Sequence, residues 1–172
     1  MRAIAIIPAR MAATRFPGKP LVTIRGLPMI EHVRRRVKMC RMLRETIVAT
    51  CDREIKEVVE YAGGKVVMTS EKHERCTDRI AEAAAGVDAD IIVNVQGDEP
   101  LILPGMIEEV IRPLFEDPEL LCSNLVTRIK DEEEFQNPNA PKVVTDRSWN
   151  ILYISREPIP SRKKATRPDY LS

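Results

Sequence analysis

The chain has 172 residues, of which 44% are hydrophobic and 31% are charged, and its formal net charge is +1. This length and composition suit one globular domain with a sizeable core, and they exclude a mainly disordered chain. The apolar runs are too short to cross a bilayer, no signal peptide is visible, and a near-neutral chain with 4% aromatic residues has no general attraction to nucleic acid. We therefore expect a cytoplasmic protein that neither inserts into membranes nor binds nucleic acid.

Strand-like and helix-like segments alternate along the chain. Ala3–Ile7 is a continuous apolar run that ends at Pro8, as is typical of a strand buried on both faces. After a loop, Pro28 begins a helix whose apolar side chains recur at helical spacing, with Arg34, Arg35 and Arg36 expected on a solvated face. The later strands are expected at 46–50, 65–68, 90–95 and 122–127, the later helices at 52–61, 77–85, 104–115 and 131–135, and a hairpin at 142–145 with 150–155.

This order predicts an α/β fold, because strands that alternate with helices of this length form a mostly parallel sheet flanked by helices. Asp52 and Thr77 are expected to cap the helices that follow them. The chain ends soon after a polar, basic loop at 161–168, so its C-terminal part is expected to be missing.

The cysteines suggest neither a zinc site nor a disulfide framework. None of them forms a C-x-x-C pair, and only two histidines could complete a metal site, so zinc is not expected. Without an export signal, buried and reduced thiols are the expected state. The residues concerned are Cys40, Cys51, Cys76 and Cys122.

The loop that follows the first strand is basic. It carries Arg10, Arg15 and Lys19, and no acidic residue occurs before Glu31. Ligands of α/β sheets bind beyond the carboxyl ends of the strands, and cations beside a glycine turn at such an end suit a polyphosphate. The alternative is a solvated basic loop. Neither the P-loop pattern nor G-x-G-x-x-G is present, which disfavours a dinucleotide cofactor.

An acidic loop, Val95–Pro100 (VQGDEP), follows the fourth predicted strand. Carboxylates at a strand end suit Mg²⁺, which proteins hold through one or two carboxylates together with substrate phosphates. The alternative is a turn with solvated acidic side chains. Because the basic and acidic loops leave the same edge of one sheet, the two together favour a metal–triphosphate site.

These segments together resemble the 3-deoxy-manno-octulosonate cytidylyltransferase (CMP-Kdo synthetase) family. The matching segments run in order from about residue 4 to residue 160, which is nearly the whole chain. They are PARMAATRFPGKPL at 8–21, VQGDEP at 95–100, Ala62-Gly63-Gly64, His73 with Thr77-Asp78-Arg79, Asn137-Pro138-Asn139 with Lys142-Val143-Val144, Tyr153-Ile154-Ser155-Arg156 and Ile159-Pro160.

The resemblance implies a nucleotide-diphospho-sugar transferase (Rossmann-like) fold in a single nucleotidyltransferase domain over 1–172, truncated at its C-terminal end. It implies a reaction in which CTP and a 3-deoxy 2-keto sugar acid (Kdo) give CMP-Kdo and pyrophosphate for lipopolysaccharide or envelope polysaccharide synthesis. The catalytic residues that it implies are Arg10, Lys19 and Asp98, with Asp98 as the Mg²⁺ ligand and Gln96 as the sugar contact. The nucleotide-binding residues that it implies are Ala9, Arg10, Arg15, Lys19, His73, Thr77 and Arg79.

Two departures from the family pattern leave alternatives open. Arg75-Cys76 stands where relatives carry a Ser-Gly pair, which leaves room for another nucleotide or another sugar acid, such as a sialic-acid relative. Relatives also continue into a segment that supplies a second metal carboxylate, sugar contacts and dimer contacts. The chain could therefore be a catalytically incomplete nucleotide-binding fragment, and a homodimer is expected only if that segment exists.

Overall fold

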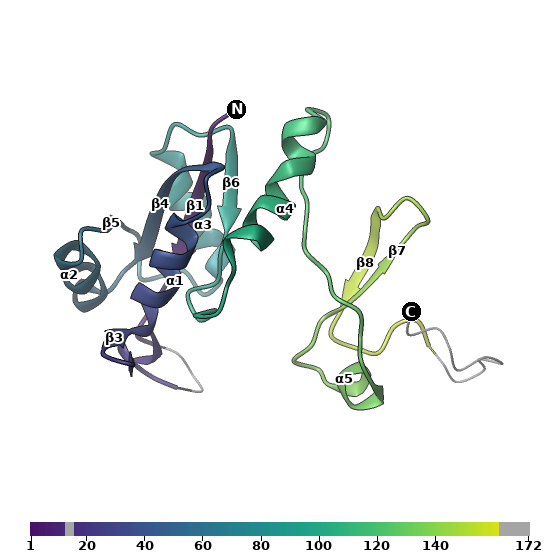
Figure 1. The fold of residues 1–172 in the computed structure, drawn as a ribbon. Helices are drawn as coiled ribbons and strands as arrows, with labels where there is room; N and C mark the ends of the chain where they lie inside the picture. Colours follow the sequence, from purple (N-terminus) through teal and green to yellow (C-terminus); the bar gives the residue numbers. More distant parts are fainter. Residues whose placement is uncertain (13–15, 162–172) are drawn as a thin grey trace. The chain divides into compact units, whose positions relative to one another are not determined.

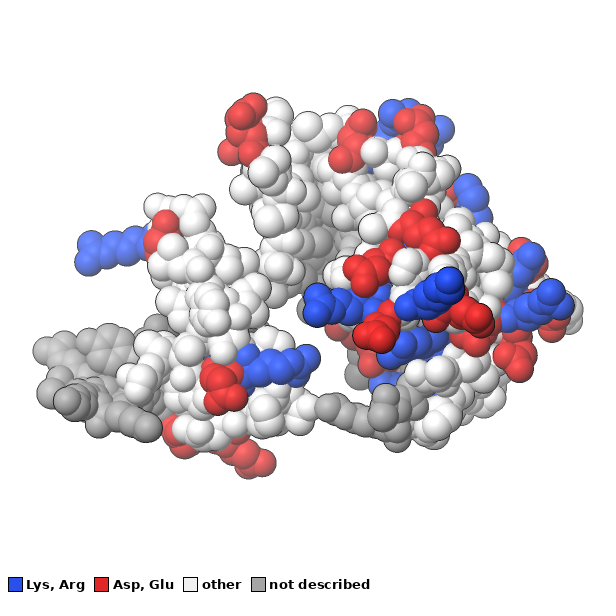
Figure 2. Space-filling view, turned by 180° about the vertical axis from the view of Figure 1, so that it is seen from behind, with Lys and Arg blue, Asp and Glu red and all other residues white. Residues whose placement is uncertain are grey.

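The computed structural model describes residues 1–12 and 16–161. The chain divides into two compact units, residues 1–124 and 125–172, and each is described by itself. No helix among the described residues is long and apolar enough to span a membrane. Basic and acidic side chains are interspersed over the face of the molecule that Figure 2 shows.

A four-stranded parallel sheet forms the centre of the first unit, with strand order β5-β4-β1-β6 (Figure 1). In the central pairing, Ile6 of β1 lies opposite Ile47 of β4 and Asn94 of β6. The carboxyl ends of β1 and β6 are therefore neighbours at one edge of the sheet, which confirms the predicted parallel arrangement. The strands are β1 (Ala3–Pro8), β4 (Leu43–Thr50), β5 (Lys65–Met68) and β6 (Ile91–Asn94).

Helices cover both faces of this sheet, and the fully buried β1 supplies side chains to both. Successive strand residues point to opposite faces, so Ala5 and Ile7 join one buried cluster, whereas Ile4 and Ile6 join the other. Side chains of α1, α2 and α4 complete the first cluster, and side chains of α3 complete the second; α1 lies in front of the sheet in Figure 1. The helices are α1 (Met29–Lys38), α2 (Arg53–Tyr61), α3 (Cys76–Ala85) and α4 (Pro104–Glu116).

Three short elements lie between β1 and α1. They are the 3-10 helix η1 (Lys19–Leu21) and the two strands of a small antiparallel ribbon, β2 (Thr23–Ile24) and β3 (Leu27–Pro28). The predicted loop thus has local structure of its own, and Pro28 is the N-cap of α1.

The second unit contains the predicted short helix and hairpin. Asp131 caps α5 (Glu132–Gln136) by accepting a 2.8 Å hydrogen bond from the Glu134 N–H, and β7 (Lys142–Thr145) pairs with β8 (Ile151–Ser155) in antiparallel fashion. The Lys142 side chain is buried, and its Nζ donates to the carbonyl groups of Asn137, Ala140 and Arg156 at 2.6, 2.8 and 3.2 Å. The family-like NPN and KVV segments therefore meet around one buried ammonium group.

Two predictions of local structure are wrong. Residues 122–127 form no strand in the described part of the chain, since Leu125 and Val126 are exposed and no neighbouring segment pairs with them. An apolar, β-branched run favours a strand only where a partner exists. Thr77 does not cap α3, because that helix begins one residue earlier, with Arg75 as its N-cap.

Two predictions of side-chain exposure are also wrong. Arg34 is buried, and it donates two hydrogen bonds to Glu31, at 2.6 and 2.8 Å, and one to the Ala62 carbonyl at 3.0 Å. The sequence pattern does not reveal this burial, because it depends on residues beyond α1. Of the thiols, only Cys40 is buried, whereas Cys76 and Cys122 are exposed.

Candidate active site

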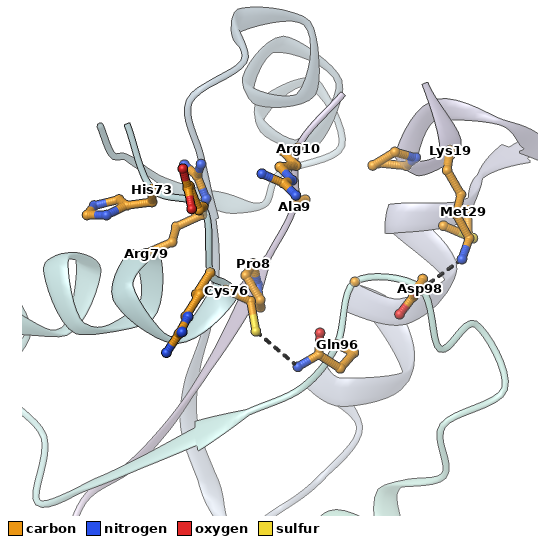
Figure 3. Close-up of a pocket in the computed structure, with 14 residues that line it drawn as sticks. Pro8, Ala9, Arg10, Lys19, Met29, His73, Cys76, Arg79, Gln96 and Asp98 are labelled. Carbon is orange, nitrogen blue, oxygen red and sulfur yellow. Dashed lines mark hydrogen bonds and ion pairs between the residues drawn. The ribbon is translucent and has the colours of Figure 1, made fainter. Parts of the chain in front are cut away.

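A cavity of about 290 Å³ lies at the carboxyl edge of the sheet in the first unit (Figure 3). Its walls come from the loop after β1, the segment that begins α3 and the loop after β6. Most of the predicted site residues line it: Ala9, Arg10, Lys19, His73, Arg79, Gln96 and Asp98. Thr77 is exposed and is not part of this lining, and Arg15 lies outside the described residues.

A close approach of two loops forms the floor of the cavity. A Cβ atom at Gly97 would lie 2.6 Å from the Pro8 carbonyl oxygen, so only glycine allows the loop after β6 to pass this close to the end of β1. This approach brings Gln96 and Asp98 to the basic loop. The parallel pairing of β1 with β6 explains why the two loops meet.

Backbone hydrogen bonds shape the basic loop. The Ala9 N–H donates to the Ala49 carbonyl at 2.9 Å, and the Gly18 N–H donates to the Met11 carbonyl at 2.9 Å. Gly18 has a φ of 75°, a conformation that glycine adopts without strain. The loop therefore returns upon itself, and Arg10 and Lys19 line the same cavity.

Lys19 and Asp98 form an ion pair at one side of the cavity, with Nζ and Oδ2 2.8 Å apart (Figure 3). Their side chains are 36% and 53% exposed. Ion pairs as exposed as this contribute little to stability. Both groups can therefore exchange this contact for a ligand at low cost.

The chemistry around Asp98 suits a hard cation. Burial, and then the negative charge of Asp98, raise the pKa of the Glu99 carboxyl above its usual value. A cation at Asp98 would relieve this repulsion. Among the described residues no cluster of three or more His, Cys, Asp or Glu side chains could hold a metal alone. The Asp98 carboxylate lines the cavity and is the kind of oxygen ligand that Mg²⁺ takes together with substrate phosphates.

Hydrogen bonds hold the α3 side of the cavity. Arg79 is only 3% exposed, donates to the Thr69 hydroxyl, and places Nη2 3.4 Å from the Cys51 sulfur. The His73 ring is hydrogen-bonded to the Glu82 carboxylate, which also accepts the Ser70 N–H at 2.9 Å. These two bonds, the Ser70 bond first, lower the pKa of Glu82 below its usual value. In Figure 3 His73 lies on the opposite side of the cavity from Lys19.

Gln96 is oriented by two weak contacts. Its Nε2 lies 3.2 Å from the Asn94 Oδ1 and 3.7 Å from the Cys76 sulfur, the latter drawn in Figure 3. Cys76 and Arg75, the pair for which a departure from the family pattern was expected, both line the cavity. Glu74 lies in the stretch His73–Arg79 that the resemblance implied for the nucleotide base, and it lines the cavity as well. Sequence reasoning did not find Met29, which also lines it, because no local pattern distinguishes it from a core residue of α1.

The parallel sheet and the cations and carboxylate at its carboxyl edge define an α/β protein of the nucleotidyltransferase fold class. The chain belongs to the cytidylyltransferase family, whose model matches residues 4–171. This membership confirms the resemblance inferred from the motifs.

Individual relatives agree with this family. The chain is 54% identical, over 94% of its length, to 3-deoxy-manno-octulosonate cytidylyltransferase of Geobacter metallireducens, and it spans 63% of that protein's length. It is 47% identical to the protein of the same name from Syntrophotalea carbinolica, over 98% of this chain and 68% of that one. A solved structure of CMP:2-keto-3-deoxy-manno-octonic acid synthetase complexed with CTP is similar with a TM-score of 0.86 and 39% identity, over 96% of this chain and 68% of that one.

Proposed function

We propose that this chain transfers CMP from CTP to the 3-deoxy sugar acid Kdo, with release of pyrophosphate. The observation that carries the proposal is the convergence of Arg10, Lys19 and Asp98 on one cavity in a member of the cytidylyltransferase family. The names of the relatives support Kdo as the acceptor, and the CTP complex of a similar protein supports CTP. We further propose a cytoplasmic enzyme that serves lipopolysaccharide or envelope polysaccharide synthesis.

In this reaction the anomeric hydroxyl of the sugar acid attacks the α-phosphorus of CTP. The new P–O bond forms as the bond to the leaving pyrophosphate breaks, and the hydroxyl proton passes to solvent water. Such a transfer needs positioning and charge stabilisation more than covalent help from the protein. Arg10 and Lys19 bind phosphate oxygens and stabilise the charge that builds up on the pyrophosphate. Gln96 is proposed to orient the sugar acid through its amide group.

Asp98 is the proposed holder of Mg²⁺, together with oxygens of the bound nucleotide. When bound, Mg²⁺ supplies Lewis-acid neutralisation of the phosphate charge. The Lys19 ammonium group also forms an ion pair with Asp98. Nucleotide binding then lets the Lys19 ammonium group pass from a carboxylate to a phosphate, so the charge of neither residue is left uncompensated.

The nucleotide-binding contacts of Ala9, His73, Arg79, Arg15 and Thr77 remain predictions. The first three line the cavity, which supports them. A second candidate function is CTP binding without turnover; the chain spans 63% of the length of its Geobacter relative. Homodimer formation is also a proposal, and light scattering of the purified chain tests it.

The test of function is pyrophosphate release from the 172-residue chain with CTP, Mg²⁺ and Kdo, run beside calorimetry of CTP binding. We expect release that needs all three components and that falls when UTP, ATP or GTP replaces CTP, or when a sialic acid replaces Kdo. Arg10→Ala should weaken CTP binding, whereas Arg112→Ala, an exposed arginine outside the cavity, should not. Binding without release would establish the second candidate, and absence of binding to any nucleotide would refute both.

A further inference from the structure

Asp52 stands at the N-cap of α2 but does not cap that helix. A capping aspartate normally accepts a hydrogen bond from a backbone N–H in the first turn of its own helix. The Asp52 side chain makes no such bond. Its Oδ2 instead accepts the N–H of Met11 at 2.8 Å, from a residue 41 positions earlier in the chain. The side chain is therefore used for the basic loop and not for the helix.

This bond fixes the backbone next to Arg10. On one side of Arg10, the Ala9 N–H is bound to the Ala49 carbonyl at the end of β4. On the other side, the Met11 N–H is bound to Asp52, which follows the same strand. The Met11 carbonyl in turn accepts the Gly18 N–H, next to Lys19. Arg10 and Lys19 are thus tied to the end of β4, and Asp52 supplies the side-chain part of this attachment.

The position of the Asp52 carboxylate is itself well defined. The Asp52 N–H donates to the hydroxyl of the buried Thr50 at 3.1 Å, and the Cys51 sulfur lies 3.6 Å from the same Oδ2 that accepts Met11. Arg79 contacts this sulfur, so the bonded chain continues to the α3 wall of the cavity. These local bonds hold the Asp52 carboxylate in place independently of its bond to the basic loop.

The negative charge of Asp52 indicates that this residue holds the basic loop in place and does not bind the nucleotide. A carboxylate that faced a polyphosphate would repel it. Asp52 is not among the residues that line the cavity, so it acts on the loop from behind. A hydrogen bond to an ionised acceptor is also stronger than one between neutral groups, which suits an attachment that must hold a loop against thermal motion.

We infer that Asp52 is a positioning residue, which holds the Met11 amide and thereby places Arg10 and Lys19 for the polyphosphate of the nucleotide. The ligand in this inference rests on the proposed function. The attachment of the loop does not, because the Met11–Asp52 bond exists whatever the cavity binds.

The test combines hydrogen exchange of the Met11 amide, followed by NMR, with calorimetry of CTP binding. In Asp52→Ala we expect the Met11 amide to exchange faster and CTP to bind more weakly, each by about tenfold, the effect of losing a hydrogen bond to a charged group. Asp52→Asn keeps an acceptor oxygen but loses its charge, so it should show both effects to a smaller but measurable extent. The matched control is Asp117→Ala, since Asp117 likewise accepts a backbone N–H, that of Glu119 at 2.9 Å, but is not part of the cavity lining.

A double-mutant cycle separates positioning from general damage to the fold. In an Arg10→Ala background, Asp52→Ala should weaken CTP binding by less than about threefold, because one of the two groups that Asp52 places is already absent. An unchanged Met11 exchange rate in Asp52→Ala, or an equal loss of CTP affinity with and without Arg10, would overturn the inference. If Asp52→Ala does not fold, faster Met11 exchange in Asp52→Asn than in Asp117→Ala supports the inference, and equal rates overturn it. If the wild-type chain binds no CTP, the proposed function fails, while Met11 exchange still decides whether Asp52 holds the loop.

Discussion

Asp98 forms an ion pair with Lys19 and is also the proposed Mg²⁺ ligand. Asp98→Asn keeps the size of the side chain and removes its charge. We expect pyrophosphate release to fall on the order of 100-fold, as when one stabilising group is taken from a reaction centre, and to need more Mg²⁺. Titration of the rate with Mg²⁺ measures this, with Asp88→Asn, a surface partner of Arg2, as the control. A near-normal Mg²⁺ dependence in Asp98→Asn would remove the metal assignment.

We predict that the stability of the fold depends on pH through the Glu82 carboxylate. Its pKa is lowered by the Ser70 N–H and then by His73, so the ionised form is favoured by folding. A lowered carboxylate pKa contributes stability above the unfolded pKa of about 4.3, and this stability is lost as the pH falls through the folded value. Urea unfolding should therefore show Glu82→Gln to be slightly less stable than wild type at about pH 7, and this difference should shrink toward about pH 3.

The neighbouring Glu71 supplies the control for that experiment, because it is an exposed carboxylate in the same segment. Glu71→Gln should leave the urea midpoint unchanged at both pH values. A difference between Glu82→Gln and wild type that persisted undiminished at the lower pH would contradict the attribution to an ionised carboxylate.

At the scale of the elements, Gly97 limits how the loop after β6 passes the end of β1. A Cβ atom there would lie 2.6 Å from the Pro8 carbonyl, and β1 cannot yield because it is buried and paired on both sides. We expect Gly97→Ala to lower the free energy of unfolding by roughly 1–3 kcal/mol, the usual cost of overpacking. We also expect it to weaken CTP binding, since Gln96 and Asp98 would be displaced from the cavity.

Gly105 is the matched glycine for this prediction. A Cβ atom there meets nothing within 4 Å, and the residue lies in the helix α4. Gly105→Ala should be neutral or stabilising, by up to about 1 kcal/mol, because alanine favours the helix. Equal urea midpoints for Gly97→Ala and Gly105→Ala would show that the close approach at Gly97 is not tight.

The elements that could be predicted from sequence are those whose signal is local. The apolar run identifies β1, and the helical spacing of apolar residues identifies α1. The two loops that follow β1 and β6 predict the position of the cavity from sequence. Where the determinant is distant, prediction failed. Residues 122–127 have the composition of a strand but no partner among the described residues. Arg34 is buried and donates to the carbonyl of Ala62, which lies beyond α1. The Asp52 carboxylate accepts the distant Met11 N–H and does not cap its own helix.

At the scale of the whole chain, the buried core is unequally divided. The first unit contains the two apolar clusters that cover the sheet, whereas the only buried side chains among the described residues after 124 are Phe135 and Lys142. Stability grows with apolar burial. The second unit is therefore expected to unfold at a lower denaturant concentration than the first.

Trp149 makes this difference measurable, because it is the only tryptophan of the chain and lies in the second unit. Tryptophan fluorescence should report a urea midpoint below that of far-UV circular dichroism, which is dominated by the four helices α1–α4 of the first unit. Coincident midpoints would instead support the prediction of a single cooperative domain.

Lys142→Met tests the same order of unfolding by destabilising the second unit alone. The substitution removes the donor from three carbonyl groups around a buried position, and leaving such groups unsatisfied costs roughly 1–3 kcal/mol. We expect the fluorescence midpoint to fall while the circular dichroism midpoint stays, because all three carbonyls belong to the second unit. Lys130→Met, at an exposed lysine of the same unit, should change neither. If Lys142→Met lowered both midpoints equally, the two units would share one unfolding transition, and the unequal core would not set the order of unfolding.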